Sequence, residues 1–513
     1  MLPPRKLHLN MKFTTLSLTM IIKQPLKNKT AHTLKWNLVD RVASQVLYAV
    51  TGIVLARELP HEDFGLVGAV LIFQAFASLL VDSGFSYALI QRKRPSRLDY
   101  STVLWFNLFM AVLLYLVLFA GAPLIAWFFR NDLRLIPLTR VICISIILNA
   151  SAIVQANRLM KAMDVRMIAA SNALGLIVGG VTGIALALTG FGAWAIVWQT
   201  IVTAAVKSIV LWTSSRWRPL MRFSWRSLRS YFGIGSRMML TSFLNTLFQY
   251  IYSFFIGYKA GLGSLGYYTQ SDKWSKMGVT SLTQVLTSSF LPALSAVQDD
   301  AVRYSLMVSK MNRFTAYLLF PTMFGLMLMA TPVFHTLFGT KWDPSIILFQ
   351  LLLLRGVFTV LNSLYTNYLL SLGFGSDIVK LEILRDTVAI IALGVTFPFL
   401  DLTAPGDPVY GIRILLWGQL VATVLTWVAT LVDTVRRTRI PLGRYIADMM
   451  PYLAQTLLIV PVMWYVGYFF ESAWMKLIAE AITGVVLYVG GNKFFGSRIQ
   501  KEVLTYFRKG KIM

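Results

Sequence analysis

The chain has 513 residues, of which 56% are apolar and 14% charged, with a formal net charge of +26. A soluble chain of this length normally carries about a quarter charged residues, so the composition excludes a large soluble globular protein. The basic residues lie in short segments between apolar runs, which is typical of membrane-protein loops and argues against nucleic acid as a partner. The single cysteine, Cys143, excludes a disulfide framework, and the scattered histidines predict no metal or cofactor.

Residues 1–35 form the first distinct segment. They carry seven Lys or Arg and no acid, and no cleavage signal follows their one mildly apolar stretch. We expect a disordered basic cytoplasmic tail, for which Met11 and Met20 are alternative starting residues.

Fourteen candidate membrane spans follow between residues 36 and 494, of which the eighth is predicted at 278–296. Crossing about 30 Å of hydrocarbon takes roughly 20 residues of helix. Helices are required, because open strands would leave backbone groups unsatisfied in lipid. The expected fold is therefore an all-α polytopic membrane protein.

The loops divide these spans into bundles and orient them. Lys and Arg concentrate in the segments assigned to the cytoplasm, which places both termini inside. The predicted parts are an N-terminal six-helix bundle, a basic linker, a C-terminal six-helix bundle, a basic loop, two extra spans and a cytoplasmic tail (36–213, 214–232, 233–431, 432–449, 450–494 and 495–513).

The two bundles resemble each other in sequence. Gly65 and Gly266 follow the first and seventh spans, and each comes seven or eight residues after a base. The fourth and tenth spans each carry an arginine followed by an asparagine: Arg140 with Asn149, and Arg355 with Asn362. Six spans return the chain to its starting side, so the copies are expected to be parallel.

Ionisable and amide side chains within the spans are the candidate functional residues, because a charge in hydrocarbon is costly unless it faces a polar cavity or a partner. Arg355 lies deepest. Arg41 and Arg237 could instead snorkel to the cytoplasmic boundary, Arg140 could be interfacial, and amides could serve only as interhelical hydrogen bonds. Acids occur only near predicted helix ends, and the cation excess favours an anionic cargo. The candidates are Arg41, Arg140, Arg237, Arg355, Asn362 and Gln249 for substrate, and Asp40 and Asp386 for coupling.

Several segments carry a family resemblance: ARELPHEDFGLVG (56–68), DSGFSYALIQRK (82–93), GFGAWAIVWQ (190–199), LGYYTQSDKW (265–274) and LFGTKW (337–342). With them the chain resembles the polysaccharide transporter (Wzx-like flippase) family of the multidrug/oligosaccharidyl-lipid/polysaccharide exporter superfamily. It looks closest to the colanic acid and teichuronic acid exporter branch.

The resemblance implies a V-shaped pair of six-helix bundles with alternating access. The implied cargo is an undecaprenyl-diphosphate-linked oligosaccharide, flipped across the bacterial inner membrane without covalent chemistry. It implies that Arg41, Arg140, Arg237 and Arg355 hold the diphosphate, and that a polysaccharide polymerase and chain-length machinery are partners. Tyr267 and Tyr268 could stack on sugars or belong to an interfacial aromatic belt.

Three other functions compete with this interpretation. A multidrug cation antiporter of the same superfamily would need a buried carboxylate in the middle of a helix, and none is predicted there. A membrane glycosyltransferase or polymerase would need a large polar loop or catalytic domain, whereas every predicted loop is short. A structural scaffold would not account for duplicated bundles.

Overall fold

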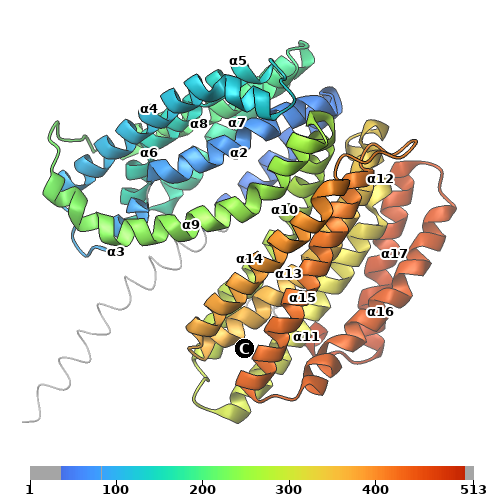
Figure 1. The fold of residues 1–513 in the computed structure, drawn as a ribbon. Helices are drawn as coiled ribbons and strands as arrows, with labels where there is room; N and C mark the ends of the chain where they lie inside the picture. The colour runs from blue at the N-terminus through green and yellow to red at the C-terminus, as the bar shows by residue number, and fades with distance from the viewer. Residues whose placement is uncertain (1–35, 38, 83, 216, 503–513) are drawn as a thin grey trace, which may run out of the picture. The chain divides into compact units, whose positions relative to one another are not determined.

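The computed structural model describes residues 36–37, 39–82, 84–215 and 217–502 (Figure 1). These residues form helices joined by short turns, and the β pairing among them is limited to one bridge between Ala404 and Asp407. The expected all-α fold is confirmed. The predicted tail at 1–35 and the last residues, 503–513, lie outside the described residues.

The chain divides into two compact units. Unit 1 holds the described residues up to Leu59 and then Val70–Gln249, and unit 2 holds Pro60–Ala69 and the residues from Tyr250 onward. Helices α2 (His61–Asp82) and α9 (Trp225–Lys259) therefore contribute to both units. The predicted linker at 214–232 lies within unit 1.

Unit 1 is a helical bundle in which α6 packs on α4 and α8, and α8 packs closely on α7. Cys143 separates α5 from α6 within the predicted fourth span. Besides most of α2 and the start of α9, the unit contains the helix Val39–Glu58, α3 (Phe85–Gln91), α4 (Arg97–Phe128), α5 (Leu135–Ile142), α6 (Ile144–Lys161), α7 (Val165–Leu188) and α8 (Ala193–Ser214).

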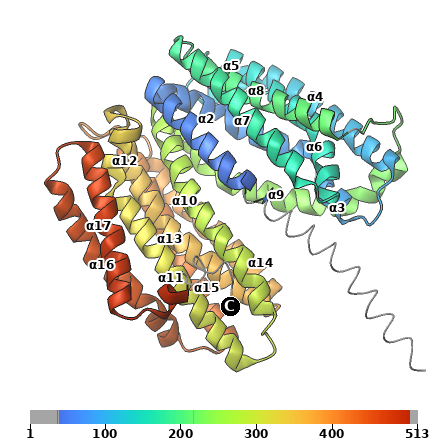
Figure 2. The same cartoon turned by 180° about the vertical axis from the view of Figure 1, so that it is seen from behind.

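Unit 2 is built around α13, which packs on α10, α11 and α15 (Figure 2). Helix α16 packs on α11 and on α17. The two extra spans are thus an integral part of this unit. Its helices are α10 (Leu262–Ser295), α11 (Ala301–Leu328), α12 (Ala330–Leu337), η1 (Thr340–Trp342), α13 (Asp343–Ser371), α14 (Gly375–Thr396), η2 (Phe397–Phe399), α15 (Tyr410–Thr438), α16 (Leu442–Tyr468) and α17 (Ala473–Phe494).

The protein is a multi-pass membrane protein. Ten helices in the described part of the chain are long and apolar enough to cross a membrane, or eleven if the bent pair α11 and α12 forms one span. Helices α9, α10 and α14 are as long but more polar, and they do not meet that criterion. Fourteen spans therefore remain a prediction. Polar helices in a membrane protein usually face its interior or a water-filled cavity.

Local sequence explains where several helices begin. Ser96 and Asp99 form a reciprocal capping box at the start of α4, in which each side chain accepts from the other residue's backbone N–H. The Asp300 side chain accepts from two backbone N–H groups at the start of α11. Gly261, at φ 94°, precedes α10 in a conformation that favours glycine.

One hydrogen bond in each unit joins an asparagine amide to a hydroxyl on another helix. The Asn157 amide donates to the Ser86 hydroxyl at 2.7 Å, and the Asn367 amide donates to the Thr287 hydroxyl at 3.4 Å. The donors follow one another by 210 residues (367 − 157) and the acceptors by 201 (287 − 86).

Gly65 and Gly266 mark a helix crossing within unit 2. A Cβ added to Gly65 would lie 1.8 Å from the Leu262 carbonyl oxygen, and one added to Gly266 would lie 1.9 Å from the His61 carbonyl oxygen. The first turns of α2 and α10 therefore touch backbone to backbone. The contact is symmetric, since 266 − 65 and 262 − 61 both equal 201.

Two predicted cytoplasmic segments are more ordered than expected. The predicted loop at 432–449 is a short turn, because α15 continues to Thr438 and α16 starts at Leu442. The predicted tail at 495–513 begins by folding back on unit 2, where Ile499 is buried and Glu502 pairs with Lys310 at 2.6 Å.

Candidate functional site

Unit 2 carries a charged cluster that the predicted span boundaries missed. Because α10 starts at Leu262 and not near residue 278, it contains Asp272, Lys273 and Lys276. These residues lie ten to fourteen positions into the helix, which corresponds to about 15–21 Å along its axis. The expectation that acids occur only near helix ends is therefore wrong for Asp272.

Asp272 is only partly neutralised. The Lys276 ammonium lies 2.7 Å from Asp272 Oδ2, and the two side chains are 38% and 15% exposed. The other carboxylate oxygen is buried and has no hydrogen-bond partner among the described residues. Lys273 lies with its ammonium 5.5 Å from the centre of the Trp274 ring. The cluster thus brings two cations and one acid to one stretch of α10.

Arg355 lies near the middle of α13, the helix that packs most closely on α10. It is half-buried, and its charge acts on the phenol hydroxyls of Tyr252 and Tyr268. No carboxylate of the described residues lies within ion-pair distance of it. Asn362, about two turns further along α13, has a buried side-chain oxygen without a hydrogen-bond partner in the same part of the chain. Arg355 and Asn362 therefore both retain binding capacity.

Unit 1 arranges its charges differently, around Asp40 on the helix Val39–Glu58. The Asn172 amide donates to both Asp40 carboxylate oxygens, at 3.2 and 3.1 Å, and the Ser44 hydroxyl donates at 3.2 Å. Lys207 on α8 is close enough to interact electrostatically with Asp40. The acid is thus held by neutral donors and one cation.

Small residues bring Lys207 close to α7. A Cβ added to Gly175 would lie 3.4 Å from Lys207 Cβ, and one added to Gly179 would lie 2.0 Å from the Thr203 hydroxyl. Glycines spaced four apart allow two membrane helices to approach closely. The tight contact between α7 and α8 therefore fixes the position of the Lys207 side chain relative to Asn172.

The remaining predicted site residues do not join either cluster. Arg140 is on α5 and packs against α4, where its Nε donates to the Phe119 carbonyl at 3.3 Å and its guanidinium lies 4.5 Å from the Phe119 ring. Arg41 and Gln249 are exposed, on the first helix and on α9. Asp386 on α14 pairs with its neighbour Arg385 at 3.0 Å. Arg237 lies on α9, and its side chain is outside the described residues.

The tyrosine pair that could have stacked on sugars is not available for that role. Tyr267 and Tyr268 are 9% and 3% exposed. The Tyr267 ring stacks on His61 with centroids 4.2 Å apart and packs edge-on against Trp342. Both rings therefore belong to the packed core of unit 2.

A sequence signal for the α10 cluster did exist. Asp272 and Lys276 stand four positions apart, which is the spacing of an ion pair on one helical face. Gly261 and the glycines after it suggested a loop, although Gly261 alone takes a left-handed conformation there. The close backbone approach at Gly266 explains why that position inside the helix is a glycine.

Comparison with known proteins identifies the family of this chain. Residues 54–347 match the model of a family described as "Polysaccharide biosynthesis protein", which is more than half of the 513 residues. The chain belongs to this family. The match includes the Asp272–Lys276 pair and the whole of α7 and α8, and it ends just after the start of α13.

Curated relatives of this family member are named for transport and surface polysaccharides. The succinoglycan biosynthesis transport protein ExoT of Rhizobium meliloti (strain 1021) is 25% identical over 471 residues, or 88% of this chain and 90% of that protein. The lipopolysaccharide biosynthesis protein WzxC of Escherichia coli (strain K12) is 25% identical over 66% of this chain and 70% of its own length.

Solved structures show the fold of this family member. The lipid II flippase MurJ, in an inward closed conformation, superposes with a TM-score of 0.70 at 14% identity, covering 90% of this chain and all of that one. An inward-facing multidrug resistance transporter of the MATE family has a TM-score of 0.59 at 15% identity and covers 77% of this chain and 94% of its own. The chain therefore has the fold shared by these transporters.

Proposed function

We propose that the protein is a flippase that moves polyprenyl-diphosphate-linked oligosaccharide across a bacterial inner membrane, for the synthesis of a surface polysaccharide. The observation that carries the proposal is the group of cations deep in the helices of unit 2: Arg355, Lys273 and Lys276, the last of which pairs with Asp272. A diphosphate needs such compensation, because an unpaired charge in hydrocarbon is costly.

In this mechanism the diphosphate is held by Arg355, and its sugars meet amides such as Asn362. Arg41, Arg237 and Gln249 are further candidates for contact with the substrate, and Asp40 and Asp386 are the candidates for coupling. The polyprenyl tail stays in lipid throughout, so only the polar headgroup needs a hydrated path. No bond is made or broken, and the protein alternates between inward-open and outward-open states.

The proposal extends to the cellular setting. Both termini lie in the cytoplasm, consistent with the basic linker and the basic loop between α15 and α16. A polymerase and chain-length machinery act on the delivered units at the outer face. Relatives named for succinoglycan transport and lipopolysaccharide biosynthesis support a role in this process.

A cation antiporter is the second candidate, favoured by the MATE-like fold and by Asp272 within α10. The carboxylate of Asp272 is already paired with Lys276 at 2.7 Å, so a cationic substrate would have to displace a tethered ammonium. Asp40 is likewise occupied by Asn172 and Ser44. We therefore place the flippase first.

The deciding experiment uses a deletion strain and measures which leaflet holds the lipid-linked repeat units. We expect intact units to accumulate in the cytoplasmic leaflet and surface polymer to be lost, with the wild-type gene restoring both. Arg355→Ala should fail to restore export while reaching the membrane at wild-type level. The exposed Arg436→Ala, at the end of α15, is the matched control. Normal polymer with altered resistance to cationic drugs would favour the antiporter.

A further inference from the structure

The segment that joins α8 to α9, together with the first two turns of α9, presents two opposite faces. Its outward side, which we call the arginine–aromatic face, alternates bases with large apolar side chains, all of them exposed: Met221, Arg222, Phe223, Trp225, Arg226, Arg229 and Phe232. Met221 is 85% exposed and Trp225 is 73% exposed. An exposed apolar cluster of this size indicates a binding surface.

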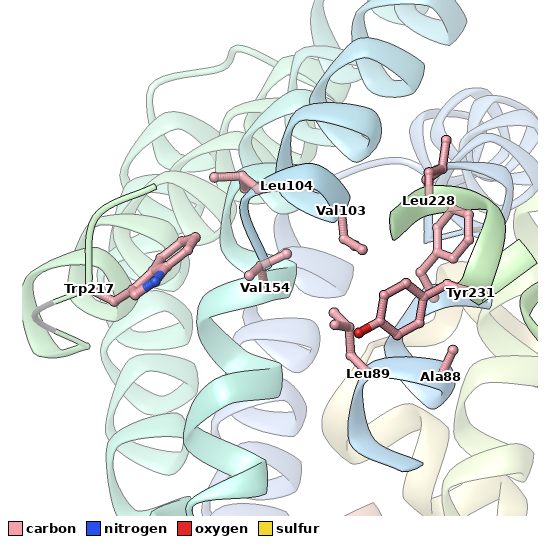
Figure 3. Close-up of a cluster of buried hydrophobic side chains, with 9 residues drawn as sticks. Ala88, Leu89, Val103, Leu104, Val154, Trp217, Leu228 and Tyr231 are labelled. Carbon is pink, nitrogen blue, oxygen red and sulfur yellow. The ribbon is translucent and has the colours of Figure 1, made fainter. Parts of the chain in front are cut away.

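The inward side fixes this segment to unit 1. Trp217, Leu228 and Tyr231 are buried in one cluster with side chains of α3, α4 and α6 (Figure 3). Hydrogen bonds add to the packing, because the Trp105 indole N–H donates to the Leu220 carbonyl at 2.8 Å and the Leu220 N–H donates to the Ser101 hydroxyl at 2.9 Å. The outward face is therefore presented by a rigid segment.

The arginines of this face are not neutralised within the described residues. No acid occurs in the sequence between Asp164 and Asp272. The acid that approaches the segment from α4 is Asp99, and it already accepts from the Ser227 hydroxyl and lies 3.8 Å from Arg92. The face thus carries uncompensated positive charge beside aromatic rings. This charge complements an anionic partner.

The length of α9 allows this face to lie at the bilayer surface if the helix crosses the membrane. The helix has 35 residues and is about 50 Å long, whereas the hydrocarbon core is about 30 Å thick. If Lys259 marks one boundary, the first turns of α9 extend into the opposite headgroup layer, and ordinary helix tilt keeps Trp225 there. Trp, Phe and Arg are the side chains that favour this layer.

A hollow of about 590 Å³ runs along the face. The described residues that line it are Trp225, Arg226, Leu228, Arg229 and Phe232. Two guanidinium groups one turn apart, flanked by aromatic rings, suit a phosphate group with attached apolar chains, since arginine binds phosphate oxygens in a bidentate manner.

We propose that the arginine–aromatic face binds the headgroups of anionic phospholipids in the cytoplasmic leaflet. Residues 1–35 carry seven bases and no acid, so their charge does not complement this face. The binding holds the start of α9, a helix that contributes to both units, at the membrane surface. It does not depend on which cargo the protein transports.

The test uses the full-length protein and two phospholipids, one anionic and expected to bind the face, the other zwitterionic and expected not to. Purified protein is titrated with phosphatidylglycerol or phosphatidylcholine, and native mass spectrometry counts the lipids retained. In a second readout, Cys143→Ala removes the one native cysteine, and a fluorophore on Met221→Cys reports contact with vesicles of phosphatidylcholine with or without phosphatidylglycerol. We expect preferential retention of phosphatidylglycerol and a contact that weakens at high salt.

The variant that carries Arg222→Gln, Arg226→Gln and Arg229→Gln should lose the preference, by on the order of fivefold for each arginine removed. The side chains are exposed, so its unfolding midpoint should not change. Trp225→Ala with Phe232→Ala should weaken retention of both lipids. The matched control removes three exposed arginines of unit 2: Arg436, Arg439 and Arg498.

Three results would overturn the proposal. Equal retention of the two lipids would exclude charge recognition. An equal loss in the control variant would show a general effect of net charge. Competition for the face by a polyprenyl diphosphate, with none by phosphatidylglycerol, would identify a docking site for cargo instead. Any of these results would leave the leaflet experiment on transport unaffected, so the two proposals can fail separately.

Discussion

The two units treat charge in opposite ways. In unit 1 the carboxylate of Asp40 is satisfied by the Asn172 amide and the Ser44 hydroxyl, with Lys207 nearby. In unit 2 the carboxylate of Asp272 relies on Lys276, and one of its oxygens has no partner among the described residues. The Asp40 cluster is thus balanced locally, whereas the cluster around Asp272 contains more cations than acids, with Lys273, Lys276 and the nearby Arg355.

This difference indicates that two helical units of one chain can have different tasks. A balanced cluster holds helices together, because the charge of its acid is already satisfied by neighbouring donors. A surplus of cations costs free energy until an anion arrives. We therefore expect substitutions in unit 2 to alter anion handling, and substitutions in unit 1 to alter packing or coupling.

The largest effect is expected for Lys276→Ala. It would leave the largely buried Asp272 without its ion-pair partner, and removing one member of a buried pair costs up to about 3 kcal/mol when one side chain is partly exposed. Thermal unfolding of the purified protein measures the loss. Adding Asp272→Asn should recover most of the stability but not the transport. Equal stability of the single and double variants would mean that Asp272 does not need an ion-pair partner. That result would contradict the proposed difference between the two units.

Two glycine substitutions, one in each unit, should have effects of opposite sign on stability. Gly179→Ala on α7 would place a Cβ 2.0 Å from the Thr203 hydroxyl and 2.8 Å from the Gln199 carbonyl oxygen, so we expect a loss of about 1–3 kcal/mol. Gly394→Ala on α14 meets no atom within 4 Å and should stabilise by about 0.5–1 kcal/mol. Unfolding midpoints measured side by side check both. A stable Gly179→Ala variant would show that α7 and α8 are not held by close approach.

Asp40→Asn should have a moderate effect. The amide keeps one acceptor for Asn172 but loses the carboxylate charge beside Lys207, which should cost about 1 kcal/mol. If Asp40 takes part in coupling, export should become independent of the proton or ion gradient while binding of the lipid-linked unit persists. Transport in vesicles with and without an imposed gradient measures this. Wild-type gradient dependence would remove Asp40 from the coupling role.

Much of the fold was predictable because long apolar runs and basic loops obey simple rules. The all-α class and the family resemblance were both predicted correctly. The start of α10 was missed because glycines and three charged residues look like a loop, whereas the backbone contact at Gly65 and Gly266 keeps them helical. Tertiary packing there overrides local propensity, as it commonly does. The division at Gln249 was equally hidden, since α9 continues through it.

The candidate site was only partly predictable. Arg355 was singled out from its depth in a span, and it lies near the middle of α13 as expected. The Asn172 partner of Asp40 could not be found, because the two residues are 132 positions apart and no periodicity links them. Whether the predicted residues bind cargo remains a prediction. The nearby Lys273 and Lys276 add two cations to the predicted binding site.

The smallest effect is expected for Arg140→Ala. This variant tests whether a cation must lie deep in a helix, as Arg355 does, to take part in export. The Arg140 side chain is held by the Phe119 carbonyl and ring, so its removal costs one hydrogen bond and one cation–π contact, each worth about 1 kcal/mol or less. We expect export within about twofold of wild type, which corresponds to roughly 0.4 kcal/mol. Arg355→Ala, assayed in parallel, provides the contrast, and Arg140→Lys keeps the charge while losing the planar stacking. If Arg140→Ala abolished export as fully as Arg355→Ala, while folding normally, unit 1 would share the anion-binding role and the division of tasks would be wrong.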